Sequence, residues 1–583
     1  MNPEKTRHIT AEIIRNYLET VSREISATIE NTAMSPIFTL THDYSCGVCY
    51  NAGDEIQLVA RDLAVPTHIF STVESVRTIL ERYGSDVAAG DVFLVCDPYM
   101  GGTHIPDWTV IRPVFIGARP AFFTIVRGHI NDAGGPMPGN YNAEARDMWQ
   151  EGFRIPPLRI VHSEEPVADL WRVILANTRT PQEVTGDLKA MIGACGTGER
   201  RLIELIARYG APTVEASVVD ILRHSEVQVR EQIARWPDGV YRHVEYVDHD
   251  YAGNRDLPIA ITVTIAGDSL TVDFTGSSGE AAGYVNSPPC NSMAQVFIAL
   301  TAMCPEIPVN SGFFRPIRVV LPERSIVNPR PPAPVGHCTL VPATTITDAV
   351  MKALEQAAPE LVGTASCDMA GNRCFGVDSR SGRYWISSDM AGSPMSAGGA
   401  FGTDGWGAWA ATFSSLRIPP LEVFEMQFPW RYELAEYAID TAAPGRWRGA
   451  PAHHYRRLNL DPMRANVYNS GYRNSLAGYA GGKRGAGNYW ILREGAADEM
   501  RATECSFAEL LPAGSRVFSQ SGGGGGWGDP MERDPAAVLE DWLDELVSLE
   551  GARRDYGVVI DAPSCSVDLA ATEALRRRLH SSN

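Results

Sequence analysis

The sequence predicts a large mixed α/β protein with several domains, and three observations carry that prediction. The chain has 583 residues, which suggests about three to five domains at roughly 100–200 residues each. Apolar residues make up 44% of the chain and charged residues 21%, as in an ordinary globular protein with a sizeable core. Helical periodicity and strand alternation occur in separate segments. We therefore expect mixed sheets, a strand-rich N-terminal region and a central helical segment.

The N-terminal segment shows helix and hairpin patterns in succession. Apolar residues recur at three- and four-residue steps over residues 9–32, which predicts an amphipathic helix that stops at Ser35-Pro36. The runs CGVCY and IQLVA, joined by the turn NAGDE, predict a hairpin. A further helix is expected over about 69–83.

Residues 91–130 are strand-rich and contain two glycine-bearing loops, at 99–104 and 130–135. Polar residues in these loops stand at the ends of expected strands, where rigid scaffolds commonly present reactive groups. Later in the chain we expect helices over 182–236, 292–303, 346–357 and 535–549, and strands over 240–276. From about residue 360 the composition favours irregular loops and short strands.

Charge and composition exclude several classes of function. The formal net charge is −19 and the pI is about 5.2, so an acidic surface disfavours binding to nucleic acid or to an anionic membrane. The N-terminus has no apolar signal region, and no stretch reaches 18 apolar residues. The 11 cysteines suggest no disulfide framework, and Cys46 and Cys49 are interpreted as core or strand thiols rather than ligands or a redox pair. We expect a cytoplasmic protein.

The sharpest feature is a duplicated spacing. His104-Ile-Pro-Asp107 and His129-Ile-Asn-Asp132 are both His-x-x-Asp, and both lie in loops at expected strand ends. Neutral imidazole and carboxylate are suitable ligands for zinc, manganese or iron. The alternative is a set of hydrogen-bonded loop residues, and Asp132 could be a partner of a ligand rather than a ligand itself. Asp43 could add a further carboxylate.

Long segments in register resemble the hydantoinase B/oxoprolinase family. These segments are HDYSCGVCYNAGDEIQLVARDLAVPTHIFS, GDVFLVCDPYMGGTHIPDWTVIRPVF, GHINDAGGPMPGN, EGFRIPPLRI, IPVNSGFFRPIRVVLPERSIVNP, LEVFEMQFPWRYE, GRWRG and GGGGGWGDPMERDPAAVLEDWLDELVSLEGARRDYGVV. The resemblance covers almost the whole chain in the same order, and is therefore much more specific than a single short motif.

The resemblance implies a subunit of an N-methylhydantoinase, 5-oxoprolinase, caprolactamase, or acetone or acetophenone carboxylase. It implies a divalent metal bound by Asp43, His104, Asp107 and His129. A hydantoinase A-like partner would carry ATP and Mg in a heterooligomer. His68 matches a family position and is expected either to line the substrate pocket or to be a capping or core residue.

Four regions are expected from these patterns. They are an N-terminal α/β metal-site region (1–165), a helical segment (166–238), a central α/β region (239–440) and a C-terminal Gly-rich region with the final helix (441–583). The glycine run that precedes Trp527 lacks the Gly-Lys-Ser/Thr of a P-loop, so close packing on another backbone or on the partner subunit is favoured over a phosphate cradle. Glu151 and Arg154 are expected to support the site structurally.

Three hypotheses about function follow. The first is an ATP-dependent cyclic amidase acting on a hydantoin, lactam or oxoproline-like ring, with Asp132 as general base or as the group that orients a ligand. The second is an ATP-dependent ketone carboxylase, in which the same residues serve because both reactions develop negative charge on a carbonyl-derived oxygen. The third is a non-catalytic scaffold subunit with a structural metal. The sequence leaves the substrate and the metal open.

Overall fold

The computed structural model describes residues 3–62, 65–363, 370–392, 395–407, 416–475 and 477–580. The chain divides into two compact units. The first contains residues 1–244 and 259–350 with a short segment at Arg417, and the second contains residues 245–258, 351–412 and 418–583. Among the described residues, no helix is long and apolar enough to cross a membrane. The four regions expected from the sequence stay a prediction.

The first unit is built on a seven-stranded sheet in the order β2-β1-β5-β4-β3-β6-β7. Every neighbouring pair in it is antiparallel. The strands are β1 (Tyr44–Asn51), β2 (Ile56–Arg61), β3 (Val92–Val95), β4 (Asp107–Ile116), β5 (Arg119–His129), β6 (Leu158–His162) and β7 (Glu165–Pro166). The expected hairpin and the strand-rich stretch over 91–130 are therefore confirmed.

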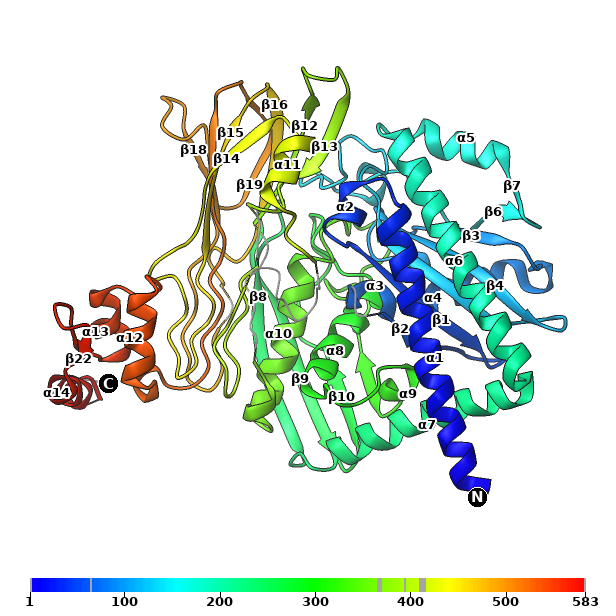
Figure 1. Ribbon diagram of the computed structural model, residues 1–583, viewed down its shortest axis with the longest axis horizontal. Helices are drawn as coiled ribbons and strands as arrows, with labels where there is room; N and C mark the ends of the chain where they lie inside the picture. The colour runs from blue at the N-terminus through cyan, green and yellow to red at the C-terminus, as the bar shows by residue number, and fades with distance from the viewer. Residues whose placement is uncertain are drawn as a thin grey trace. The chain divides into compact units, whose positions relative to one another are not determined.

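Helices α1 (Pro3–Thr32) and α6 (Pro181–Tyr209) lie side by side over this sheet (Figure 1). The buried face of α1 repeats at helical spacing, because Leu18, Val21 and Ile25 are all fully buried in the core. α5 (Ala168–Ala176) and α7 (Ala211–Ile233) complete this helical set. The helices expected over 9–32 and 182–236 are confirmed.

The helix expected over about 69–83 is present and ends where predicted, although two helices share the stretch. They are α3 (Pro66–Phe70) and α4 (Thr72–Tyr83), and Ser71 separates them. The Ser71 hydroxyl donates to the carbonyls of Thr67 and His68, and thus competes with continuation of the helix. The break sets His68 on its own short element.

A second sheet has the order β11-β10-β9-β8. Its strands are β8 (Gly239–His249), β9 (Arg255–Ala266), β10 (Ser269–Asp273) and β11 (Ile317–Val320). The helices that follow in the chain are α8 (Pro289–Met303), α9 (Ser311–Phe314) and α10 (Val341–Glu355), of which α8 contacts α3 and α9 contacts α7. The expected strands and helices of this part of the chain are confirmed.

The second unit contains two antiparallel sheets, drawn in yellow and orange in Figure 1. One has β13 (Tyr384–Ser388), β12 (Ala370–Val377), β16 (Met463–Asn469) and β19 (Cys505–Leu511) in that order. The other has β14 (Trp430–Tyr437), β15 (His453–Asn459), β20 (Arg516–Gln520), β17 (Tyr489–Leu492) and β18 (Met500–Ala502). The mixed α/β class with several sheets is confirmed.

The end of the chain corrects the prediction of one final helix over 535–549. Three helices are present, α12 (Pro535–Leu543), α13 (Leu549–Tyr556) and α14 (Leu569–His580). The break follows from Glu545, whose φ is +58°, and from Ser548, whose hydroxyl accepts from the Gly551 amide and caps α13. A small hairpin of β21 (Ile560–Asp561) and β22 (Ser566–Val567) precedes α14.

A glycine-rich extended segment, residues 522–526, crosses the second unit and hydrogen-bonds to several other segments of it. The amide of Gly523 donates to Ala486 O (2.9 Å), that of Gly524 to Ala450 O (3.0 Å) and that of Gly526 to Lys483 O (3.0 Å). A Cβ atom on Gly524 would lie 2.1 Å from the backbone oxygen of Ala397. This segment therefore packs on other backbones, as favoured from the sequence, and only glycine fits there.

We predict that Gly524→Ala destabilises the second unit by about 3 kcal/mol, because the added methyl group clashes with a carbonyl that belongs to another backbone. Gly193→Ala is the matched control. Gly193 lies inside α6 with nothing within 4 Å of its added Cβ, so this change should stabilise by about 0.5–1 kcal/mol. Urea unfolding of both variants checks the pair. Equal effects would contradict the packing argument.

Candidate metal centre

Two facing strand ends bring the His-x-x-Asp motifs together. Asp107 is the first residue of β4 and His129 is the last residue of β5, and the register of the two strands places them directly opposite one another. Directly opposed residues of an antiparallel pair project on the same face of a sheet. The two side chains therefore meet, and His104 reaches them from the loop that precedes β4.

The three side chains form a compact buried cluster. One ligand atom each of His104, Asp107 and His129 lies within 4.8 Å of the others. All three residues are buried. His104 Nε2 has no hydrogen-bond partner in the described part of the chain, and an orphaned imidazole nitrogen in a buried site is suited to a metal. Two imidazoles and one carboxylate fit zinc, manganese or iron.

Asp107 is the centre of this cluster. Its Oδ2 lies 2.8 Å from His104 Nδ1 and also accepts a hydrogen bond from the Thr103 hydroxyl. Its Oδ1 lies 3.3 Å from His68 Nε2 and 3.5 Å from His129 Nδ1. Burial alone raises the pKa of Asp107, but the neighbouring imidazoles outweigh burial and hold the pKa well below its ordinary value. The carboxylate is thus ionised and ready to bind a cation.

Asp43 and His68 border the cluster. The carbonyl of Asp43 accepts from the His129 amide (3.0 Å), which fixes the loop before β1 against the end of β5. Asp43 Oδ1 lies 3.8 Å from His68 Nε2. Burial lowers the pKa of His68, but the carboxylates of Asp107 and Asp43 outweigh it and raise the pKa above its ordinary value. Asp43 as a fourth ligand stays a prediction.

Asp132 holds the same place in the second His-x-x-Asp motif as Asp107 does in the first, but its carboxylate contacts Arg179 rather than imidazoles. Its carboxylate accepts from the backbone amide of Arg179 (2.6 Å), from Arg179 Nη1 (2.8 Å) and from the Gly139 amide (3.2 Å). These contacts hold the loop after β5 against the segment that leads into α6. Its expected role as general base or orienting group stays a prediction, and the contacts place its carboxylate on a guanidinium.

Arg127 is a functional residue that the sequence reasoning missed. It precedes His129 by two positions on β5 and is fully buried. Its five N–H donors are all used, on Thr109 Oγ1 (2.6 Å), His68 O (3.1 Å), Ser71 Oγ, Ser75 Oγ (2.7 Å) and Gly101 O (2.6 Å). A lone arginine inside the apolar strand AFFTIVRGH was the signal that could have identified it.

Aromatic rings that no sequence pattern predicted form one wall of the candidate centre. Tyr141 stacks on His129, with ring centroids 5.9 Å apart and planes at 11°. The next ring outward is His337, whose centroid is 6.0 Å from that of Tyr141 and 5.0 Å from that of Tyr284. The Tyr141 ring therefore restricts the orientation of the His129 imidazole, and His337 packs against Tyr141 in turn.

Glu151 supports this wall from behind, as expected from the sequence. Its Oε1 accepts from the Gly336 amide (2.5 Å), next to His337 in the chain, while Oε2 has no hydrogen-bond partner among the described residues. Burial raises the pKa of Glu151 to about 8. Arg154 pairs with Asp97, with Nε and Oδ2 3.3 Å apart. Cys46 and Cys49 are buried free thiols in β1.

Comparisons with known proteins extend over nearly the whole chain. The family model described as Hydantoinase B/oxoprolinase matches residues 7–530. The caprolactamase subunit beta of Pseudomonas jessenii is 33% identical over 582 residues, which cover 97% of this chain and 98% of that protein. The crystal structure of an ATP-dependent caprolactamase from Pseudomonas jessenii matches with a TM-score of 0.90 at 32% identity, over 98% of this chain and 99% of that chain.

A nucleotide-free acetone carboxylase structure matches with a TM-score of 0.88, over 98% of this chain and 83% of that chain. The two sequences are only 18% identical, so this likeness shows the fold alone.

We predict that Glu151→Gln removes a pH dependence of stability. The native state holds a proton on Glu151 up to about pH 8, whereas the unfolded chain releases it near the ordinary pKa, so stability falls as pH rises between those values. The slope is about 1.4 kcal/mol per pH unit. Glutamine stays neutral and keeps an oxygen for the Gly336 amide. Urea unfolding between pH 5 and pH 8 with a chelator present should show a flatter profile for the variant.

The control for this experiment is Glu165→Gln, because Glu165 is exposed in β7. Its pH profile should match that of the wild type. A Glu151→Gln profile parallel to the wild type would contradict a neutral Glu151.

Proposed function

The chain belongs to the hydantoinase B/oxoprolinase family, and from that membership we propose that it is the metal-binding subunit of an ATP-dependent cyclic amidase. Its substrate class would be a hydantoin, a lactam or an oxoproline-like ring. The observation that carries the proposal is the buried cluster of His104, Asp107 and His129. The relative named as caprolactamase subunit beta supports both the substrate class and assembly with a partner.

Each residue of the centre has a part in this proposal. His104, Asp107 and His129 would hold the metal, with Asp43 as the fourth ligand. A bound divalent ion would supply Lewis acidity, which polarises water and lowers its pKa towards neutrality. ATP would act on a hydantoinase A-like partner, because amide resonance makes an unactivated lactam slow to hydrolyse.

His68 and Asp132 would position other groups rather than bind the metal. His68 Nε2 lies 3.3 Å from Asp107 Oδ1, so a proton held on that nitrogen fixes the orientation of the Asp107 carboxylate. Asp132 holds the loop after β5 through Arg179. Of the two roles expected for Asp132, orientation is better supported than proton abstraction, because three donors already occupy its carboxylate.

A ketone carboxylase subunit is the second candidate. It is supported by a relative named as acetophenone carboxylase delta subunit of Aromatoleum aromaticum, which is 27% identical over 554 residues that cover 87% of this chain and 80% of that protein. The same ligands would stabilise an enolate oxygen while carbon is added. Bicarbonate dependence separates the two chemistries, since only the carboxylase consumes it. A scaffold subunit with a structural metal would require a site closed by four protein ligands, without an open position.

We predict that the purified wild-type chain binds about one divalent metal and that His104→Ala with His129→Ala loses it, because two of the three clustered ligands are removed. Elemental mass spectrometry after growth with zinc, manganese and iron measures the content. His224→Ala is the matched control, since His224 is exposed on α7 and should leave the content unchanged. A wild type without metal would sink the ligand assignment.

We predict that the chain, co-expressed with a hydantoinase A-like partner, opens cyclic amides only when ATP is present. Asp107→Asn should lower the rate at least a hundredfold, because a neutral amide replaces the central carboxylate ligand. Chromatography of the ring-opened acid measures the rate. Product that requires bicarbonate would favour the carboxylase instead. No product from hydantoins, lactams or ketones would leave the scaffold reading as the better account.

A further inference from the structure

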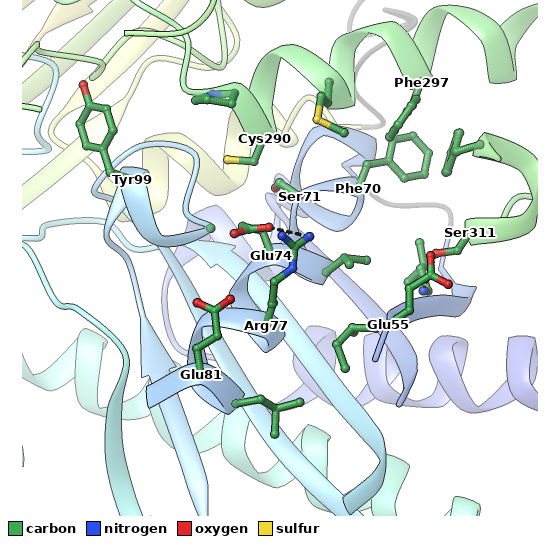
Figure 2. Close-up of a pocket in the computed structure, with 18 of the residues that line it drawn as sticks. Glu55, Phe70, Ser71, Glu74, Arg77, Glu81, Tyr99, Cys290, Phe297 and Ser311 are labelled. Carbon is green, nitrogen blue, oxygen red and sulfur yellow. Dashed lines mark hydrogen bonds and ion pairs between the residues drawn. The ribbon is translucent and has the colours of Figure 1, made fainter. Parts of the chain in front are cut away.

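A pocket of about 940 Å³ lies in the first unit, away from the metal ligands (Figure 2). Its walls come from the β1–β2 turn, α3, α4, α8 and α9. The volume falls within the range of about 300–1,000 Å³ that is usual for small-molecule sites. None of the residues proposed to bind metal lines it.

One end of the pocket is aromatic. The rings of Phe297 and Phe314 stack with centroids 3.9 Å apart, and Phe70 meets Phe314 edge-on at 5.2 Å. Figure 2 shows Phe70 and Phe297 together at this end. Met293 on α8 adds a flexible apolar side chain that is 38% exposed. Such a surface packs against a hydrocarbon chain, and the faces of its aromatic rings attract a cation.

The lining of the pocket is acidic. Glu74 and Arg77 on α4 form an ion pair in which Oε2 and Nη2 are 2.9 Å apart. Figure 2 draws this pair, with Glu81 on the same helix. Arg315, the other lining cation, pairs with Glu226 at 3.1 Å. Asp54 and Glu81 line the pocket without an ion-pair partner in the described parts of the chain. An unbalanced negative charge therefore remains.

The floor of the pocket belongs to the framework of the metal centre. Ser71 and Gly101 line the floor, and both bind Arg127 from the other side. Cys290 also lines it, and its thiol donates to Gly102 O at 2.8 Å. Because these atoms are already bonded, the floor is preformed and does not need a ligand to order it.

We propose that this pocket is a second ligand site, specific for a small amphipathic ammonium compound. The hydrocarbon chain of the ligand packs on the three phenylalanines and Met293, and the uncompensated carboxylates of the lining attract its ammonium group. A carboxylate of the same size is excluded by the uncompensated acids, whereas a neutral compound lacks their attraction. The site is separate from the metal cluster and does not depend on it.

Isothermal titration calorimetry of the full chain with n-hexylammonium tests the proposal. Hexanoate, which also has six carbons but carries the opposite charge, is the comparison probe. We expect hexylammonium to bind at least tenfold more tightly than hexanoate. Asp54→Asn with Glu81→Gln should weaken hexylammonium about three- to tenfold, as expected for two partly exposed charge contacts. Both side chains are exposed, so this variant keeps the fold.

Two further variants make the test specific. Met293→Trp fills the aromatic end and should reduce hexylammonium binding at least tenfold. The metal-site variant His104→Ala with His129→Ala should bind hexylammonium like the wild type, which separates this site from the proposed catalytic centre. Exposed Glu165→Gln is the charge control and should have no effect. Equal affinities for the two probes, binding unaffected by the pocket variants, or binding lost in the metal-site variant would each overturn the proposal.

Discussion

The buried guanidinium of Arg127 is the group that holds together the elements around the candidate metal centre. A charged group inside a protein is costly unless its hydrogen-bonding capacity is filled, and here all five donors of Arg127 are engaged. The acceptors come from α3, α4, the loop before β4 and β4 itself. Arg127 therefore ties to β5 the elements that surround the ligands. Its loss would leave several buried acceptors without partners.

The register of β4 and β5 extends this constraint to the ligands. Arg127 faces Thr109, and His129 faces Asp107 one step further along the same face of the sheet. Strands held in register by a saturated guanidinium cannot shift without breaking its hydrogen bonds, so Asp107 and His129 stay opposed. The Asp107 carboxylate is also held in place by its polar contacts with the surrounding imidazoles and with the Thr103 hydroxyl. A set of side chains held in this way would need little ordering to bind the metal proposed above.

Local patterns in the sequence were enough to predict most of the elements and the residues of the buried cluster, because each depends on short-range spacing. The helix over 9–32, the hairpin and the two His-x-x-Asp motifs are of this kind. The identical spacing of the motifs nevertheless concealed a difference. Asp107 stands on β4 with its histidine before the strand, whereas His129 stands on β5 with Asp132 beyond the strand. Asp132 consequently meets Arg179, a contact between distant segments that no local pattern reveals.

The position of His68 is a second feature that local sequence patterns do not predict. Its place beside Asp107 follows from the break at Ser71, which depends on side-chain hydrogen bonds rather than on apolar periodicity. The aromatic wall of Tyr141, Tyr284 and His337 brings together residues far apart in the chain. Burial and ring stacking of this kind are tertiary properties, so a single sequence predicts the residues of the cluster but not the residues that surround them.

The glycine-rich extended segment of the second unit illustrates how backbone geometry decides between two readings of one composition. A phosphate cradle needs amide groups that point at the ligand and are free to donate. The amides of Gly523, Gly524 and Gly526 already donate to carbonyls of three other segments. A backbone N–H has one proton to give, so these amides have none left for a phosphate. The glycines serve close packing instead.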